Sequence, residues 1–95
     1  MAENKTYEID LSKVDTERKL HNALQKGLAL PDYYGKNLDA LHDCLTDIME
    51  PTVITFVGYK PAKKALEAAF YAFRNVVEDS ASENKNLTVH WRRRK

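Results

Sequence analysis

Hydrophobic residues alternate with polar ones over 5–11, so every second side chain falls on one face and a first strand is predicted. Over 15–26 the apolar residues recur at every third or fourth position instead, which predicts an amphipathic helix that stops at Gly27. A loop over 29–36 follows, in which Gly35 permits a backbone turn that other residues resist. The chain therefore begins as a strand, a helix and a loop.

The rest of the chain is predicted to form two more helices and two more strands. A second helical pattern runs from about 37 to 49 and ends before Pro51. The segment TVITFV at 52–57 is β-branched and aromatic, which is typical of a central parallel strand buried on both faces. An alanine-rich amphipathic stretch predicts one long helix over 62–79, and 86–91 predicts a last short strand.

The predicted order of elements is β-α-α-β-α-β. Strands that are separated by helices favour a parallel sheet with right-handed crossovers. The sequence therefore predicts an α/β fold, a small three-stranded parallel sheet flanked by helices. We expect a single domain over 1–95 that ends in a short basic tail at 92–95, because no repeat or long linker divides the chain.

Composition narrows the possible functions. With 95 residues, the chain has room for only a small core, and no apolar run approaches the ~20 residues that span a bilayer. The polar segment 1–10 does not resemble a signal peptide, so we expect a cytoplasmic protein without a membrane partner. Cys44 is the one cysteine, which excludes an internal disulfide, and we expect neither metal nor cofactor. We also expect a monomer when the protein is free.

Charge is segregated along the chain although the net charge is only +1. Residues 32–50 carry five acids against Lys36 alone, a net of −4, whereas the four residues of 92–95 are all basic. A net charge this small steers no partner, but a local acidic patch can attract a cationic one.

The acids of the second helix lie in a row. At helical spacing Asp39, Asp43 and Asp47 share one face, nearly opposite an apolar stripe of Leu38, Leu41, Cys44, Leu45 and Ile48. Like charges at this spacing cost a few tenths of a kcal/mol per pair, and the first-turn position of Asp39 offsets only part of that. Local stability therefore does not explain the row. One interpretation is an ordinary solvated surface, and the other is a platform for a cationic partner.

Two adjacent tyrosines favour the platform. Tyr33 and Tyr34 stand just before the acidic row, and tyrosine provides contact area in interfaces at low entropic cost. The alternative is that one of the two rings is partly buried and supports the loop, and we expect this of one ring without being able to say which.

The segment 31–45, PDYYGKNLDALHDCL, closely resembles the corresponding stretch of the barstar family of intracellular inhibitors of barnase-type ribonucleases. The preceding LHNALQKGLALP, the strand VITFV and the AFR at 72–74 follow in barstar-like order, so the resemblance covers roughly 7–91. It implies a three-stranded parallel sheet with helices around it. It also implies that the second helix and the loop before it plug a ribonuclease active site.

The resemblance further implies roles for individual residues. An acidic side chain takes the place of a substrate phosphate; Asp43 is the leading phosphate mimic and Asp39 is its acidic partner. The predicted partner-binding set also contains the surrounding residues Tyr33, Tyr34, Gly35, Asn37, His42, Thr46, Asp47, Glu50 and Asn75. The expected partner is a barnase-like ribonuclease or ribonuclease toxin, without direct contact to nucleic acid.

Three departures from the family pattern bear on the partner. His42 stands where the family's type member has tryptophan, which introduces a ring that titrates near pH ~6.5. Asn75 replaces the acid that follows the FR pair, and Glu78 lies about one turn further on. The ending WRRRK has no counterpart. The departures at His42 and Asn75 motivate a second hypothesis, a barstar-like interaction module whose partner is not a nuclease.

Two other functions are weaker. Catalysis by Asp39, His42 and Asp43 would need a concave, partly dry pocket, which a convex helix face does not provide. The basic tail at 92–95 can contact phosphates of RNA, but 1–90 sum to −3 and a frayed, solubilising terminus is favoured. Cys44 lies on the apolar stripe, where packing is favoured over a reactive thiol.

Overall fold

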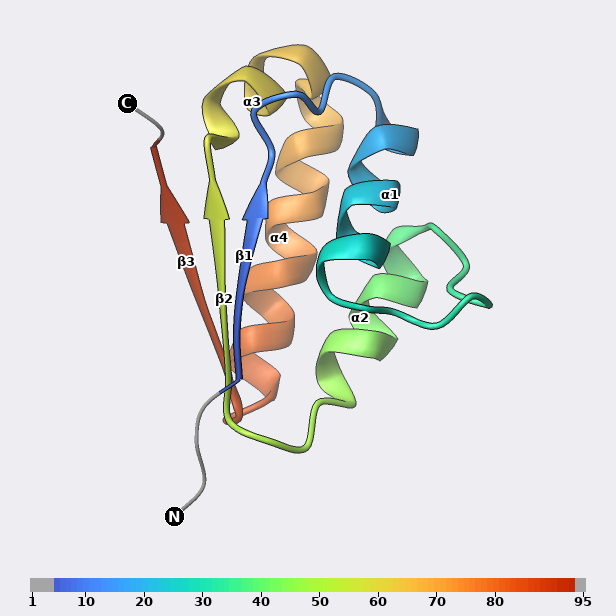
Figure 1. The fold of residues 1–95 in the computed structure, drawn as a ribbon, viewed down its shortest axis with the longest axis vertical. Coiled ribbons are helices and arrows are strands. Elements are labelled where there is room, and N and C mark those ends of the chain that lie inside the picture. Colours follow the sequence, from blue (N-terminus) through green and yellow to red (C-terminus); the bar gives the residue numbers. More distant parts are fainter. Residues whose placement is uncertain (1–4, 94–95) are drawn as a thin grey trace.

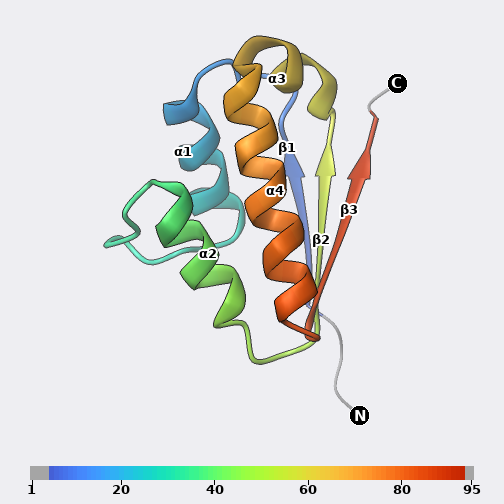
Figure 2. The same ribbon diagram turned by 180° about the vertical axis from the view of Figure 1, so that it is seen from behind.

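The computed structural model describes residues 5–93, which form one sheet with helices packed on one of its faces (Figures 1 and 2). The strands are β1 (Lys5–Asp10), β2 (Thr52–Val57) and β3 (Leu87–Arg92), all parallel, with β2 in the centre. The helices are α1 (Glu17–Gly27), α2 (Leu38–Thr46), α3 (Tyr59–Leu66) and α4 (Ala68–Glu83). The predicted parallel α/β fold is confirmed. Within 5–93, no helix combines the length and apolar character needed to cross a membrane.

Strand β2 is central, as predicted, but it is buried on one face rather than both. Ile54 and Phe56 are buried against the helices, whereas Val53, Thr55 and Val57 on the other face are half-buried. The helices cover only one face because the flanking strands turn mostly polar, exposed residues to the other, among them Thr6, Glu8, Asp10, Thr88, His90 and Arg92. The apolar sequence of β2 alone does not reveal that one face lacks helices, because neighbouring side chains on β1 and β3 partly bury the outward-facing residues of β2.

The long helix predicted over 62–79 is two helices. The chain breaks at Glu67, whose φ of 52° and ψ of −120° separate α3 from α4. Pro61 lies in the first turn of α3, where a missing N–H costs nothing. Helix α4 continues to Glu83, beyond the predicted end at 79. Ser80 lies in this added part of the helix, where it is fully buried and its hydroxyl donates to the Val76 carbonyl at 2.8 Å.

An aromatic cluster joins α3 and α4 to the sheet. Phe56 of β2 stacks on Trp91 of β3 with ring centroids 4.6 Å apart, and Phe73 meets Phe56 edge-on at 5.5 Å. Phe70 is fully buried beside them. Truncation of one such ring in a packed core costs about 3–5 kcal/mol. This cluster fixes α4 on the sheet, and α4 in turn provides the surface on which α2 packs.

Candidate functional site

Helix α2 begins at a defined cap. Asn37 has extended backbone angles and its Oδ1 accepts a hydrogen bond from the Ala40 N–H at 2.8 Å, which satisfies a free donor of the first turn. The same side chain donates from Nδ2 to the Gly35 carbonyl at 3.2 Å. The cap therefore fixes both the start of the helix and the end of the loop before it.

The two faces of α2 are as the spacing predicts. Leu41 and Leu45 are buried in the core. Asp39, Asp43 and Asp47, the acidic row, are exposed, and no lysine, arginine or histidine within 5–93 forms an ion pair with them. The row is therefore free to meet an external cation.

The two tyrosines before α2 have different environments. Tyr33 is 87% exposed, whereas Tyr34 is 5% exposed and shares a 2.7 Å hydrogen bond with Nδ1 of His21. Burial raises the pKa of Tyr34 to about 12 and lowers the pKa of His21, so both side chains are neutral near pH 7. Tyr34 is thus the ring that supports the loop, and Tyr33 offers its surface to solvent.

The loop between α1 and α2 is tied down at several points. Gln25 donates from Nε2 to the Pro31 carbonyl at 2.9 Å, and the Tyr34 N–H donates to the same carbonyl at 2.9 Å. The left-handed residues of this loop are Ala29, with φ of 53°, and Lys36, with φ of 52°, and not Gly35 as predicted. A Cβ at Gly35 would lie 3.3 Å from the Cβ of Ala40 and from Nδ2 of Asn37, so any larger residue would crowd the start of α2.

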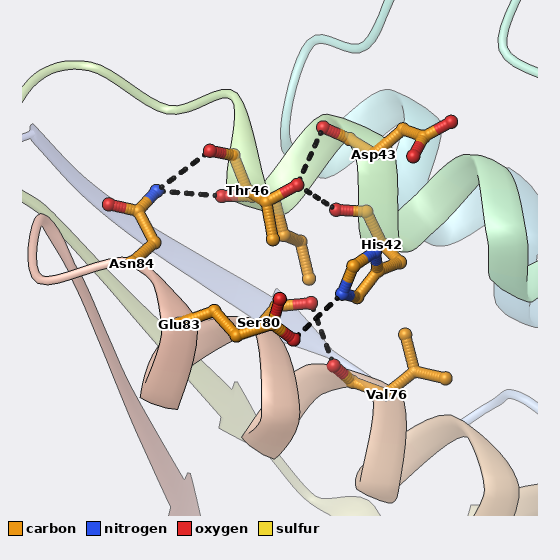
Figure 3. Close-up of polar contacts among 8 residues, drawn as sticks. His42, Asp43, Thr46, Val76, Ser80, Glu83 and Asn84 are labelled. Atoms are coloured by element: carbon orange, nitrogen blue, oxygen red, sulfur yellow. Dashed lines mark hydrogen bonds and ion pairs between the residues drawn. The ribbon is translucent and has the colours of Figure 1, made fainter.

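His42 faces α4, away from the acidic row. Its Nε2 lies 3.0 Å from Oε2 of Glu83, and Figure 3 shows the ring turned toward α4 while the Asp43 carboxylate points away from it. The hydrogen bond to Glu83 raises the pKa of His42, and the negative charges of Glu83, Asp43 and Asp79 raise it further. His42 therefore bridges two helices and does not converge with Asp39 and Asp43 on a catalytic centre.

A buried amide fixes the other end of α2. Asn84 is 7% exposed, and its Nδ2 donates to the Leu45 carbonyl at 3.0 Å and to the Ile48 carbonyl at 2.9 Å. Its Oδ1 accepts from the Asn86 N–H at 3.0 Å. Sequence reasoning missed Asn84, because an asparagine after a helix gives no sign of contacts 36–39 positions away.

A hollow of about 420 Å³ lies between the loop and α2. Four of the predicted residues, Tyr33, Tyr34, Asp43 and Asp47, belong to its lining, together with Cys44. Burial raises the pKa of the Cys44 thiol, with Asp47 and Asp43 adding to the effect, so the thiol stays protonated. The hollow is consequently acidic and partly aromatic, with no activated nucleophile among these residues.

Other predicted residues lie at the margins. Thr46 is half-buried and donates to the His42 carbonyl at 2.8 Å, and Glu50 pairs with Lys5 at 3.6 Å. Asn75 is exposed on α4, and the nearby Glu78 accepts from Trp91 at 3.1 Å.

In the basic tail, Arg92 completes β3 and pairs with Glu8 rather than with the acidic row, and 94–95 lie outside the described residues. Over the described part of the chain, no group of three His, Cys, Asp or Glu side chains could hold a metal ion.

Fold and site together define a small α/β protein that presents to solvent an acidic helix face without ion pairs to the rest of 5–93. The family model described as Barstar (barnase inhibitor) matches residues 4–92. The Bacillus subtilis (strain 168) protein named "Putative ribonuclease inhibitor YrdF" is 34% identical over 68 residues, which cover 70% of this chain and 75% of that protein. The chain belongs to the barstar family.

Proposed function

We propose that the protein binds a barnase-like ribonuclease and blocks its active site with the loop before α2 and with α2 itself. Membership of the barstar family and the similarity to a protein named as a ribonuclease inhibitor support this role. The observation that carries the mechanism is the exposed acidic row, which has no cationic partner within 5–93. We further propose that the protein acts in the cytoplasm as a monomer.

The chemistry of the target explains why carboxylates suffice. A ribonuclease cleft presents cationic side chains that bind the phosphates of RNA, and carboxylates held at similar spacing satisfy the same donors. Asp43 occupies the place of a phosphate and Asp39 assists it. The further contacts are Tyr33, Tyr34, Gly35, Asn37, His42, Thr46, Asp47, Glu50 and Asn75. The hollow between Tyr33 and the carboxylates of Asp43 and Asp47 accepts a cationic side chain of the cleft.

Rigidity of the free protein supports tight binding. The Asn37 cap, the Asn84 amide and the bond between Tyr34 and His21 hold α2 and its loop in place before any partner arrives. An interface that is already ordered loses less conformational entropy on association. The acidic row therefore meets the cleft with its spacing already set.

Inhibition of RNA cleavage tests the proposal. Titration of the protein against barnase should abolish cleavage at a one-to-one ratio, and no inhibition of barnase or other guanyl-type ribonucleases at micromolar protein would overturn the role. Asp43→Ala should weaken binding about 10–150-fold, mainly through faster dissociation, because charged donors of the enzyme lose their acceptor. Asp15→Ala is the matched control, because Asp15 lies before α1 and outside the acidic row. Glu17 is a less suitable control, since it lines a hollow together with Asn37, one of the proposed contacts. Equal losses for Asp43→Ala and Asp15→Ala would contradict the assigned role.

A second candidate is an interaction module with a partner that is not a nuclease. Two observations favour it: His42 is engaged by Glu83, and the uncharged Asn75 occupies the position expected to carry an acid. Purification of the tagged protein from its host, followed by mass spectrometry, separates the two candidates. Repeated recovery of a non-nuclease protein that Asp43→Ala releases would favour this one.

A further inference from the structure

A second hollow, of about 280 Å³, lies beside the acidic row, where the end of α2 faces the start of β1. Leu28, Leu30 and Ile48, all partly buried, contribute its apolar surface, and Met49 at its margin is 87% exposed. This hollow is continuous with the proposed binding face, because Cys44, Asp47 and Leu30 line both hollows.

The margin of the second hollow is charged and its backbone is fixed. Asp47 and Glu50 provide two carboxylates there. The Lys5 N–H donates to the Pro51 carbonyl at 2.9 Å, and the Thr52 hydroxyl donates to the Glu50 carbonyl at 2.8 Å. A lining that combines apolar side chains with two carboxylates suits a side chain with an aliphatic stem and a cationic head, which describes lysine and arginine.

The protein's own lysine already occupies part of this position. Nζ of Lys5 lies 3.6 Å from Oε2 of Glu50, and the two side chains are 55% and 62% exposed. A solvated pair of this kind contributes little to stability, so an incoming cation displaces it at low cost.

We propose that the second hollow receives a lysine or arginine side chain of the partner ribonuclease, which replaces Lys5 at Glu50. The inference rests on the proposed function and extends the interface past the acidic row toward β1. Lys5 is then a competitor of the partner, and its removal improves binding.

Affinity measurements on lysine variants test the replacement. Lys5→Gln should bind barnase about two- to five-fold more tightly than the wild type, the range that corresponds to an exposed ion pair. Lys13→Gln makes the same change in net charge in the segment between β1 and α1, so it reports the general electrostatic effect alone. In a Glu50→Gln background the gain from Lys5→Gln should vanish. Equal gains for the two lysine variants, or a gain that persists without Glu50, would overturn the inference.

A measurement without a partner separates this inference from the proposed function. Titration with n-hexylammonium should shift the NMR methyl signals of Met49 and Ile48, more strongly in Lys5→Gln, whereas hexanoate should leave them unchanged. Absence of the ammonium response would refute the cation-accepting hollow. A wild-type protein that shows this response but inhibits no ribonuclease would refute the proposed function alone. Inhibition without any effect of Lys5→Gln would refute the inference alone.

Discussion

The Asn84 amide is the contact on which the geometry of α2 depends most directly. Asn84→Ala removes the donor to the Leu45 and Ile48 carbonyls, at 3.0 and 2.9 Å, and the acceptor of the Asn86 N–H, at 3.0 Å. Each hydrogen bond contributes about 1 kcal/mol net, and a buried carbonyl left without a partner costs about 1–3 kcal/mol. We therefore expect the free energy of unfolding to fall by about 3 kcal/mol, which lowers Tm by roughly 12–24 °C in a domain of this size.

Urea unfolding followed by circular dichroism measures the loss, and two variants control it. Asn84→Asp keeps an oxygen for the Asn86 N–H but turns a carboxylate toward the carbonyls of Leu45 and Ile48, so it should destabilise at least as much as alanine. Asn75→Ala changes an exposed asparagine within α4, the helix that Asn84 follows, and should stay within about 0.5 kcal/mol of the wild type.

The aspartate variant decides whether the donor matters. If Asn84→Asp is as stable as the wild type, the bonds to α2 contribute nothing and the reasoning is wrong. Hydrogen exchange provides a second readout, since amides near the end of α2 should lose protection in Asn84→Ala before those of α1. Uniform loss across the molecule would instead indicate that Asn84 stabilises the fold without a particular effect on α2.

Two further predictions concern the contacts that brace α2 and its loop. The hydrogen bond to Glu83 raises the pKa of His42, so the stability that this bond provides is complete below the ordinary pKa of about 6.5 and is lost as pH rises through the raised pKa. Urea unfolding of the wild type between about pH 5 and 9 should show this loss of stability. The same loss in His42→Gln would contradict the assignment. Tyr34→Phe leaves Nδ1 of the buried His21 without its partner, so we expect a loss of about 1–3 kcal/mol on urea unfolding together with weaker ribonuclease inhibition. An unchanged unfolding midpoint in Tyr34→Phe would show that this bond does not hold the loop.

Local patterns were sufficient to predict most of the framework. The alternation over 5–11 and the apolar run at 52–57 identified two strands, and the spacing of Asp39, Asp43 and Asp47 placed them on one exposed face. These features depend only on the local composition and on the periodicity of apolar and polar residues, so they can be predicted without knowledge of distant parts of the chain.

Features that arise from tertiary packing could not be predicted in this way. Nothing at Glu67 marks a break, since neither glycine nor proline stands there and the helical pattern continues on both sides. The choice between Tyr33 and Tyr34 as the buried ring depends on His21, which lies in α1, thirteen residues before Tyr34. The partners of Asn84 are even more distant in sequence, and hydrogen bonds of this kind leave no periodic signal.

The same contacts explain how an unfavourable charge arrangement is kept in place. Three carboxylates on one helix face repel one another, and no cation of the described chain forms an ion pair with them, so the row raises the free energy of the isolated α2. Bonds that do not involve those carboxylates hold the helix at both ends: the Asn37 cap at its start and the Asn84 amide at its end. Because the bracing and the charges use different atoms, a cationic partner can neutralise the row without breaking any of the bonds that position it. Binding then relieves repulsion that folding leaves in place, as the proposed substitution for phosphate requires.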